Sequence, residues 1–164
     1  MYTFRDYYNN EVTLSFANHP FSKNPKHVLT ICRYNDKWLL TEHKERGLEF
    51  PGGKVDISES AVEGAIREVK EETGAIIENI DYIGQYYVKG KNDRVIKNIY
   101  YAQIKELLNQ DSYFETNGPV LLDAIPTNVK QNKSFSFIMK DDVLYYSLKF
   151  IEQKNMNSEL IQND

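Results

Sequence analysis

A glycine pair that leads into a well-capped helix is the feature that most limits how this chain can fold. Pro51-Gly52-Gly53 interrupts regular structure. The residues from 60 to 73 favour a helix, because Ser60 and Glu63 match a capping box and Gly74 suits the left-handed position beyond the last turn. We therefore expect a tight turn that places a helix at a defined angle behind it.

Three carboxylates share one face of this predicted helix. At about 100° per residue, Glu68, Glu71 and Glu72 fall within a sector about 100° wide. Their mutual repulsion, and their place near the negative end of the helix dipole, make the cluster unfavourable by itself. A divalent cation would turn it into a binding site, whereas the plainer alternative is a solvated acidic face. The buried stripe is predicted to consist of Val62, Ile66, Val69 and Thr73.

The turn before the helix offers groups that suit a metal or a phosphate. Gly52 and Gly53 allow the backbone to come close to a ligand, and the Gly53 carbonyl oxygen is available to a cation. Lys54 follows directly and is placed to meet a phosphate as a point charge.

Composition places these features in one ordinary domain. The chain has 164 residues, enough for a single core, and we expect one domain over residues 1–153 with a polar, flexible tail over 154–164. The net charge of −4 disfavours broad binding to duplex nucleic acid. The single cysteine, Cys32, excludes an internal disulfide and a cysteine-rich zinc site. With neither a signal peptide nor a membrane span in the sequence, we expect a cytoplasmic protein.

Strand patterns lie on both sides of the helix. A closing helix is expected from about Phe137 to Gln153, where apolar residues recur at helical spacing. Strands plus helices in this order predict an α/β sandwich with a mixed sheet. The expected strands cover residues 11–16, 27–34, 37–42, 48–50, 76–88, 95–104 and 119–125.

The spacing around the helix resembles the signature of a known family. Read as G-x5-E-x7-R-E-U-x-E-E-x-G-U, the pattern of the Nudix box, every fixed position matches and only Ala75 departs, at a packing position. The matched residues are Gly53, Glu59, Arg67, Glu68, Val69, Glu71, Glu72 and Gly74. With Glu49-Phe50-Pro51 before the box, the chain resembles MutT-type Nudix hydrolases. It is similar to their YtkD group of nucleoside triphosphatases over about residues 2–151.

This resemblance implies an α/β/α sandwich and a Mg²⁺-dependent hydrolase, with Mn²⁺ as a substitute, that converts a (d)NTP to a (d)NMP and pyrophosphate. Oxidised guanine nucleotides such as 8-oxo-dGTP are a favoured class. It implies that Glu71, Glu72 and the Gly53 carbonyl ligate metal, and that Glu68 is a ligand or the general base. Arg67 and Glu59 would support them.

Outside the box the resemblance gives four weaker assignments. Glu115 is the natural candidate for a further acidic residue, in the catalytic and metal-binding set, that MutT-type enzymes carry in the loop before a late strand. Phe50, His43 and Asn132 are candidates for contacting the base; His43 stands where MutT-type enzymes have an arginine. The plainer alternatives are a solvated loop acid for Glu115 and core packing for Phe50.

Two other functions stay open at this stage. Lys89, Lys91, Arg94 and Lys97 surround a predicted turn at Gly90 and could contact the 5′-triphosphate end of an RNA, although a solvated hairpin tip is the simpler reading. The second alternative is a non-catalytic nucleotide-sensing Nudix domain, against which the complete set of box acids argues. No obligate protein partner and no membrane partner are indicated.

Overall fold

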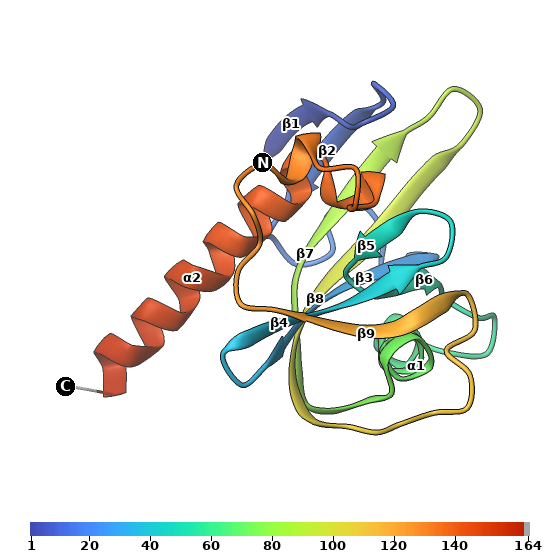
Figure 1. Cartoon of the computed structure of the whole chain (residues 1–164). Coiled ribbons are helices and arrows are strands. Elements are labelled where there is room, and N and C mark those ends of the chain that lie inside the picture. Colours follow the sequence, from blue (N-terminus) through green and yellow to red (C-terminus); the bar gives the residue numbers. More distant parts are fainter. Residues whose placement is uncertain (163–164) are drawn as a thin grey trace.

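The computed structural model describes the backbone of residues 1–162 and the side chains of residues 1–155. Its strands are β1 (Tyr2–Arg5), β2 (Glu11–Ser15), β3 (His27–Tyr34), β4 (Lys37–His43), β5 (Gly47–Glu49), β6 (Gly52–Lys54), β7 (Ala75–Lys89), β8 (Arg94–Leu107) and β9 (Thr116–Leu122). The helices are α1 (Ala61–Thr73) and α2 (Asp142–Gln162), with short 3-10 turns at Val129–Gln131 and Phe137–Met139. Figure 1 shows α1 and α2 on opposite sides of the sheet.

The predicted mixed sheet is confirmed. Its strand order is β1-β2-β7-β8-β3-β4-β5, with β6 paired to β3 and β9 paired to β4. Among the strands of residues 1–162, β3 and β8 pair in parallel and the other strand pairs are antiparallel. Strand β3 is buried almost throughout, as expected for a strand covered on both faces. Val28 and Cys32 pack on the α1 side, and Leu29 and Ile31 pack on the α2 side.

The pairing around β3 determines where the glycine turn lies. The first half of β3 pairs with β6, so that Val28 is opposite Gly53 and Leu29 is opposite Gly52. Its second half pairs with β4 instead, with Cys32 opposite Leu39. The prediction that Gly52 and Gly53 interrupt regular structure is therefore wrong, because their backbone pairs with β3 and they belong to β6. The glycine turn, residues 50–54, comprises the connection from β5 and β6 itself, directly before the loop that leads to α1.

Helix α1 has the predicted ends. Ser60 and Glu63 form a reciprocal capping box, and Gly74 adopts a φ of 76°, with its N–H donating to the Lys70 carbonyl oxygen. A side chain at this left-handed position would be strained, which explains the glycine.

The predicted buried stripe of α1 is wrong in two of its four members. Val69 and Thr73 are fully buried, but Val62 and Ile66 are 37% and 43% exposed. The small residues Gly64 and Ala65 are buried instead. Ala65 packs on Val28 and Tyr100 of the sheet, and Gly64 lies against Val55 and Glu59 of the preceding loop, so the buried face is rotated toward the carboxylates. One residue of the acidic face, Glu72, is therefore buried against the sheet side of the helix.

The ends of the predicted elements need three corrections. Phe137–Met139 is a separate 3-10 turn, so α2 begins at Asp142, and it continues to Gln162 rather than changing to an irregular tail at Lys154. The last two tail residues, 163–164, lie outside the described part. Strand β9 begins at Thr116, three residues before the predicted start, because the loop before it is already hydrogen-bonded to β4. The short strand β1 was not predicted; its residues are mostly exposed.

Helix α2 covers the second face of the sheet with its first half, through Val143, Leu144 and Ile151. Its second half projects beyond the sheet (Figure 1). Within residues 1–162, neither helix has the combination of length and hydropathy needed to cross a bilayer.

Candidate active site

A cavity of about 440 Å³ lies between the glycine turn and the opposite edge of the sheet. One wall comes from β6 and α1 and contains Gly52, Gly53, Lys54, Glu68 and Glu72. The other comes from the β4–β5 region and the start of β9 and contains His43, Arg46, Glu49, Glu115 and Thr116. The remaining lining residues include His27, Phe50, Lys97, Phe137 and Ile138. The cavity therefore brings together most of the residues predicted for the site.

Glu72 is the most deeply buried of the box carboxylates. Its side chain lines the cavity, yet Oε2 has no hydrogen-bond partner within the described part of the chain. The backbone around it is fixed, because the hydroxyls of Thr41 and Thr116 both donate to the Glu72 carbonyl oxygen at 3.0 Å. A rigidly held, unsatisfied oxygen of this kind is costly to bury and calls for a ligand.

Burial raises the pKa of the Glu72 carboxyl well above its usual range, and the neighbouring Glu68 raises it further. Burial also raises the pKa of Glu68, although the Arg67 guanidinium acts in the opposite direction. Both shifts mean that a second negative charge is disfavoured here. A cation bound between the two carboxylates would relieve the repulsion and favour the charged form of both groups.

Gly53 lies directly against the carboxyl group of Glu68. A Cβ at this position would lie 2.7 Å from the Glu68 carboxyl carbon and 2.7 Å from its Oε1. Any side chain here would therefore displace the Glu68 carboxylate from its place beside the turn. This contact explains why the glycine pair and the carboxylates are needed together.

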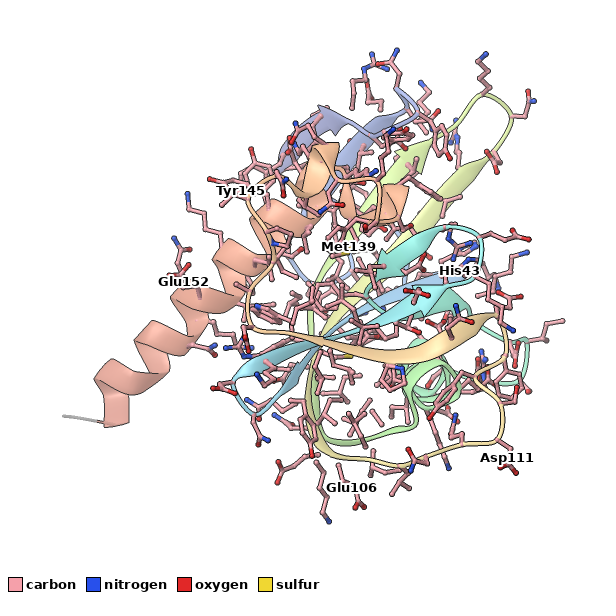
Figure 2. The ribbon with its side chains drawn as sticks, in the orientation of Figure 1. His43, Glu106, Asp111, Met139, Tyr145 and Glu152 are labelled. Atoms are coloured by element: carbon pink, nitrogen blue, oxygen red, sulfur yellow. The ribbon has the colours of Figure 1, made fainter. Side chains whose placement is uncertain are left out.

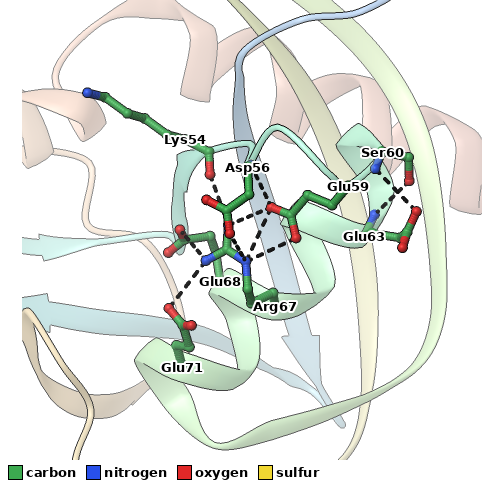
Figure 3. Close-up of polar contacts among 8 residues, drawn as sticks. All are labelled: Lys54, Asp56, Glu59, Ser60, Glu63, Arg67, Glu68 and Glu71. Atoms are coloured by element: carbon green, nitrogen blue, oxygen red, sulfur yellow. Dashed lines mark hydrogen bonds and ion pairs between the residues drawn. The ribbon is translucent and has the colours of Figure 1, made fainter.

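Arg67 binds the carboxylates on the outer side of the helix (Figure 3). Its Nη2 donates to Glu59 Oε1 at 2.6 Å and to the Lys54 carbonyl oxygen at 3.0 Å. Its Nη1 donates to Glu68 Oε1 at 2.9 Å and to Glu71 Oε2 at 3.3 Å. One guanidinium thus joins the turn, the loop before the helix and two box glutamates.

The donor set suits a hard divalent cation, although the carboxylates do not converge on a single point. In residues 1–162, no group of three or more acidic, histidine or cysteine side chains is already arranged to hold a metal. Glu71 is held by Arg67 and does not line the cavity, and the side chain of Glu115 is 86% exposed. Glu68 and Glu72 do face the cavity beside the Gly53 backbone. A site with few protein ligands fits Mg²⁺, which keeps several waters and binds substrate phosphates.

Two of the base-contact candidates occupy other places than expected. Phe50 touches the cavity but is only 1% exposed, and its ring packs edge-on against Trp38 in the core. Asn132 does not line the cavity; its Oδ1 accepts a hydrogen bond from the Ser134 backbone N–H. The third, His43, lies on the cavity wall near the β4–β5 turn (Figure 2).

The cavity contains an ion pair that the sequence did not predict. Glu49 is 2% exposed and forms a two-pronged ion pair with Arg46, at 2.9 and 3.0 Å. Their spacing of three residues across a turn was the only available signal. Lys97 is a different case: the sequence placed it with the basic residues of the hairpin tip, but its side chain lines the cavity and lies over the Tyr86 ring. Burial lowers the pKa of Lys97.

The chain was compared with known proteins. The NUDIX domain family model matches residues 23–119, more than half of the chain. A protein of Bacillus subtilis (strain 168), named "Putative 8-oxo-dGTP diphosphatase YtkD", is 58% identical over 153 residues, which cover 93% of this chain and 97% of that protein.

Solved structures agree with this result. A mutant of the Bacillus subtilis pyrophosphohydrolase BsRppH superposes with a TM-score of 0.93 at 57% identity, covering 94% of this chain and 98% of that one. A NUDIX hydrolase from Nitrosomonas europaea has a TM-score of 0.64 at 16% identity, covering 80% and 90% of the two chains. The second likeness supports the fold alone.

Proposed function

The chain belongs to the Nudix family of hydrolases, and from this premise we propose that it converts nucleoside triphosphates to nucleoside monophosphates and pyrophosphate with Mg²⁺. We propose oxidised guanine nucleotides such as 8-oxo-dGTP as a favoured class, a specificity that the name of the Bacillus subtilis relative supports. The compact cavity is of the size that small-molecule sites have.

The observation that carries the proposal is the unsatisfied Glu72 carboxylate beside Glu68 and the Gly53 backbone. Glu72 and the Gly53 carbonyl oxygen would hold the cation, with Glu68 next to them as a further ligand or as the base. When bound, Mg²⁺ would neutralise phosphate charge and acidify the attacking water.

Both walls supply groups for the rest of the polyphosphate. Lys54, on the wall formed by β6 and α1, has an exposed ammonium group that can meet a phosphate oxygen. Glu115 brings a carboxylate from the wall opposite α1, to act on a bound metal or on the water. Arg67 keeps Glu68 and Glu71 in place without lining the cavity itself.

The proposal is tested by measuring pyrophosphate and nucleoside monophosphate from a panel of normal and oxidised (d)NTPs, with and without Mg²⁺. Equal amounts of both products, formed only with the metal, are expected. Reactions in ¹⁸O-water would identify the phosphorus that is attacked. If no triphosphate of the panel is hydrolysed, this function is wrong.

A second candidate substrate is the 5′-triphosphate end of RNA. The observation in its favour is a cavity of about 330 Å³ beside the first; His27, Lys97, Phe137 and Ile138 line both. The two cavities are therefore adjacent, and the second could take a part of a substrate longer than one nucleotide. Lys89, Lys91 and Arg94 are exposed around the tip of the β7–β8 hairpin.

Charge reversal of Lys89, Lys91 and Arg94 separates the two substrates. If RNA is bound along this hairpin, RNA turnover at low salt should fall about tenfold or more, because phosphate contacts are lost, while mononucleotide turnover is unchanged. Reversal of the three exposed residues Lys105, Lys133 and Lys149 serves as a control for the same change in net charge. Equal losses on both substrates would contradict the RNA candidate.

A further inference from the structure

His43 ends strand β4 and is held in one orientation by the turn that follows it. The imidazole is only 8% exposed. Its Nδ1 accepts hydrogen bonds from the backbone N–H groups of Glu45 and Arg46, both at 3.1 Å. The ring therefore acts as a cap for the β4–β5 turn as well as a part of the cavity wall.

These two hydrogen bonds determine where the ring carries its proton. A nitrogen that accepts from two N–H donors cannot itself be protonated, so a neutral His43 has its hydrogen on Nε2. Nε2 lies 3.8 Å from Glu115 Oε2 and makes no hydrogen bond to any residue that the structure describes. A fixed donor thus faces the Glu115 carboxylate across a gap slightly too long for a hydrogen bond.

Glu115 has a fixed backbone and a free side chain. The Lys44 N–H donates to the Glu115 carbonyl oxygen at 3.2 Å, and the Lys44 Nζ donates to the Phe114 carbonyl oxygen at 3.0 Å. The next residue, Thr116, is bonded to the end of α1 through the Glu72 carbonyl oxygen. The Glu115 carboxylate has no such tie, and a small rotation of this exposed side chain would bring it within reach of Nε2.

We propose that His43 is a positioning residue whose Nε2–H donates to the Glu115 carboxylate and holds it over the cavity during the reaction. The proposal rests on the proposed function, because it matters only if Glu115 takes part in hydrolysis. In this proposal the neutral imidazole has two roles. Nδ1 accepts the hydrogen bonds that stabilise the β4–β5 turn, and Nε2–H fixes the Glu115 side chain, which would otherwise adopt many rotamers.

The two tasks can be separated by substitution. His43→Asn keeps an acceptor near Nδ1 for the turn but removes the donor at Nε2, whereas His43→Gln places an amide N–H near Nε2 and loses the acceptor. We expect His43→Asn to lower kcat about 10- to 100-fold with little change in KM. We expect His43→Gln to recover part of that loss in spite of a lower melting temperature. His19→Asn, at an αL position that asparagine tolerates, is the control for a lost imidazole.

A double-mutant cycle with Glu115→Gln gives the decisive result. If His43 acts through Glu115, His43→Asn should change kcat less than about twofold in the Glu115→Gln background. A full additional loss there would overturn the proposal and assign Nε2–H to the substrate. A Glu115→Gln enzyme as active as the wild type would also overturn it, while leaving Nudix hydrolysis intact. A wild type that hydrolyses no triphosphate would instead refute the function on which the proposal depends.

A second measurement does not require activity. The chain has 3 histidines, so the ring nitrogens can be resolved by ¹H–¹⁵N correlation NMR, and His43→Asn identifies the signals that belong to His43. We expect a protonated Nε2 and an unprotonated Nδ1. A proton on Nδ1 would overturn the proposal regardless of the kinetics.

Discussion

The two sides of helix α1 treat the same kind of residue in opposite ways. On the outer side, Glu59 and Glu71 are bound by Arg67, and every one of these contacts is a charge-assisted hydrogen bond. On the inner side, Glu72 lies buried beside Glu68 with an oxygen that has no partner in the described structure. Glu71 and Glu72, which represent the two environments, are adjacent residues of one helix.

This difference distinguishes carboxylates that stabilise the fold from carboxylates that are available to a ligand. The hydrogen-bonded carboxylates on the outer side stabilise the contact between the glycine turn and the helix. On the inner side, the Glu72 oxygen that lacks a partner destabilises the folded protein until something positive binds, whereas Glu68 keeps its hydrogen bond from Arg67. Buried groups with strongly shifted pKa values that line a cavity are typical of functional sites.

Glu72→Gln should have the largest effect on activity. Without its charge the inner side cannot hold a metal against the substrate, so we expect kcat to fall by about 10³-fold or more. In the absence of metal the same change should stabilise the fold by about 1–2 kcal/mol, because a penalised buried acid is removed. Steady-state kinetics and chemical denaturation measure the two effects.

The exposed Glu78→Gln provides the control for loss of one carboxylate, and neither its activity nor its stability should change. A Glu72→Gln enzyme that retained more than about a third of the wild-type rate would show that the inner side is not where catalysis occurs.

Arg67→Lys should have the next largest effect, and it breaks the outer side. A lysine can replace the charge of Arg67 but not its simultaneous contacts with Glu59, Glu68 and the Lys54 carbonyl oxygen. We expect about a 10- to 100-fold loss of activity and about 1–3 kcal/mol less stability. Measured together, the two losses distinguish this variant from Glu72→Gln, in which activity falls but stability rises. If Arg67→Lys lost stability but kept its activity, Arg67 would have a structural role only.

Metal addition should reverse the destabilisation of the inner side. With Mg²⁺ at about 100 times its Kd, binding to the folded state contributes about 2.7 kcal/mol, enough to raise the melting temperature by several degrees. Glu72→Gln should lose most of this shift. Thermal melts with Mg²⁺ and with EDTA measure it, and Ca²⁺ and Mn²⁺ test whether charge alone suffices. No shift for the wild type would contradict a metal site at Glu72.

The sequence alone predicted the position of α1 because both ends of this helix have strong local signals. The capping box at Ser60 and the glycine at position 74 depend only on neighbouring residues, and both were found. The rotation of the helix was not predicted, since it depends on tertiary contacts of two small residues: Ala65 packs on β3 and β8, and Gly64 lies against the loop before α1. Hydrophobic periodicity identified Val62 and Ile66 as buried, but close packing of small residues overrode it.

The site was predictable to the same extent. The box acids were found from their spacing, whereas the opposite wall is assembled from residues far apart in sequence, such as His43, Lys97 and Glu115. Lys97 shows the limit clearly. In sequence it belongs to a group of basic residues near a turn, but alternation along β8 turns its side chain into the cavity. No local pattern distinguishes it from the lysines at the tip.

Asp141→Asn should have the smallest effect, which we expect on the pH dependence of stability. This substitution tests whether burial also penalises a carboxylate outside the Nudix box. Asp141 precedes α2, and its Oδ1 accepts a hydrogen bond from the Val143 N–H at 2.9 Å. Its pKa is raised to about 7, chiefly by burial and also by Asp6 and Asp142, against the opposing effects of the Val143 N–H and of Lys97. Asparagine keeps the helix cap and removes the charge.

The sign of the pH dependence follows from that shift. The folded state holds the Asp141 proton more tightly than the unfolded state, so stability is highest at low pH and is lost as the pH rises from about 4 to 7. Relative to Asp141→Asn, the wild type should lose about 1 kcal/mol between pH 5 and pH 6, because in this range the carboxyl is mostly charged in the unfolded state and mostly protonated in the folded state. Denaturation curves of both proteins across this range cancel the titrations they share. If the free energies of unfolding of the two proteins changed with pH in the same way, burial would not penalise a charged carboxylate at Asp141. The same cause, which we invoke for the raised pKa of Glu72, would then be in question.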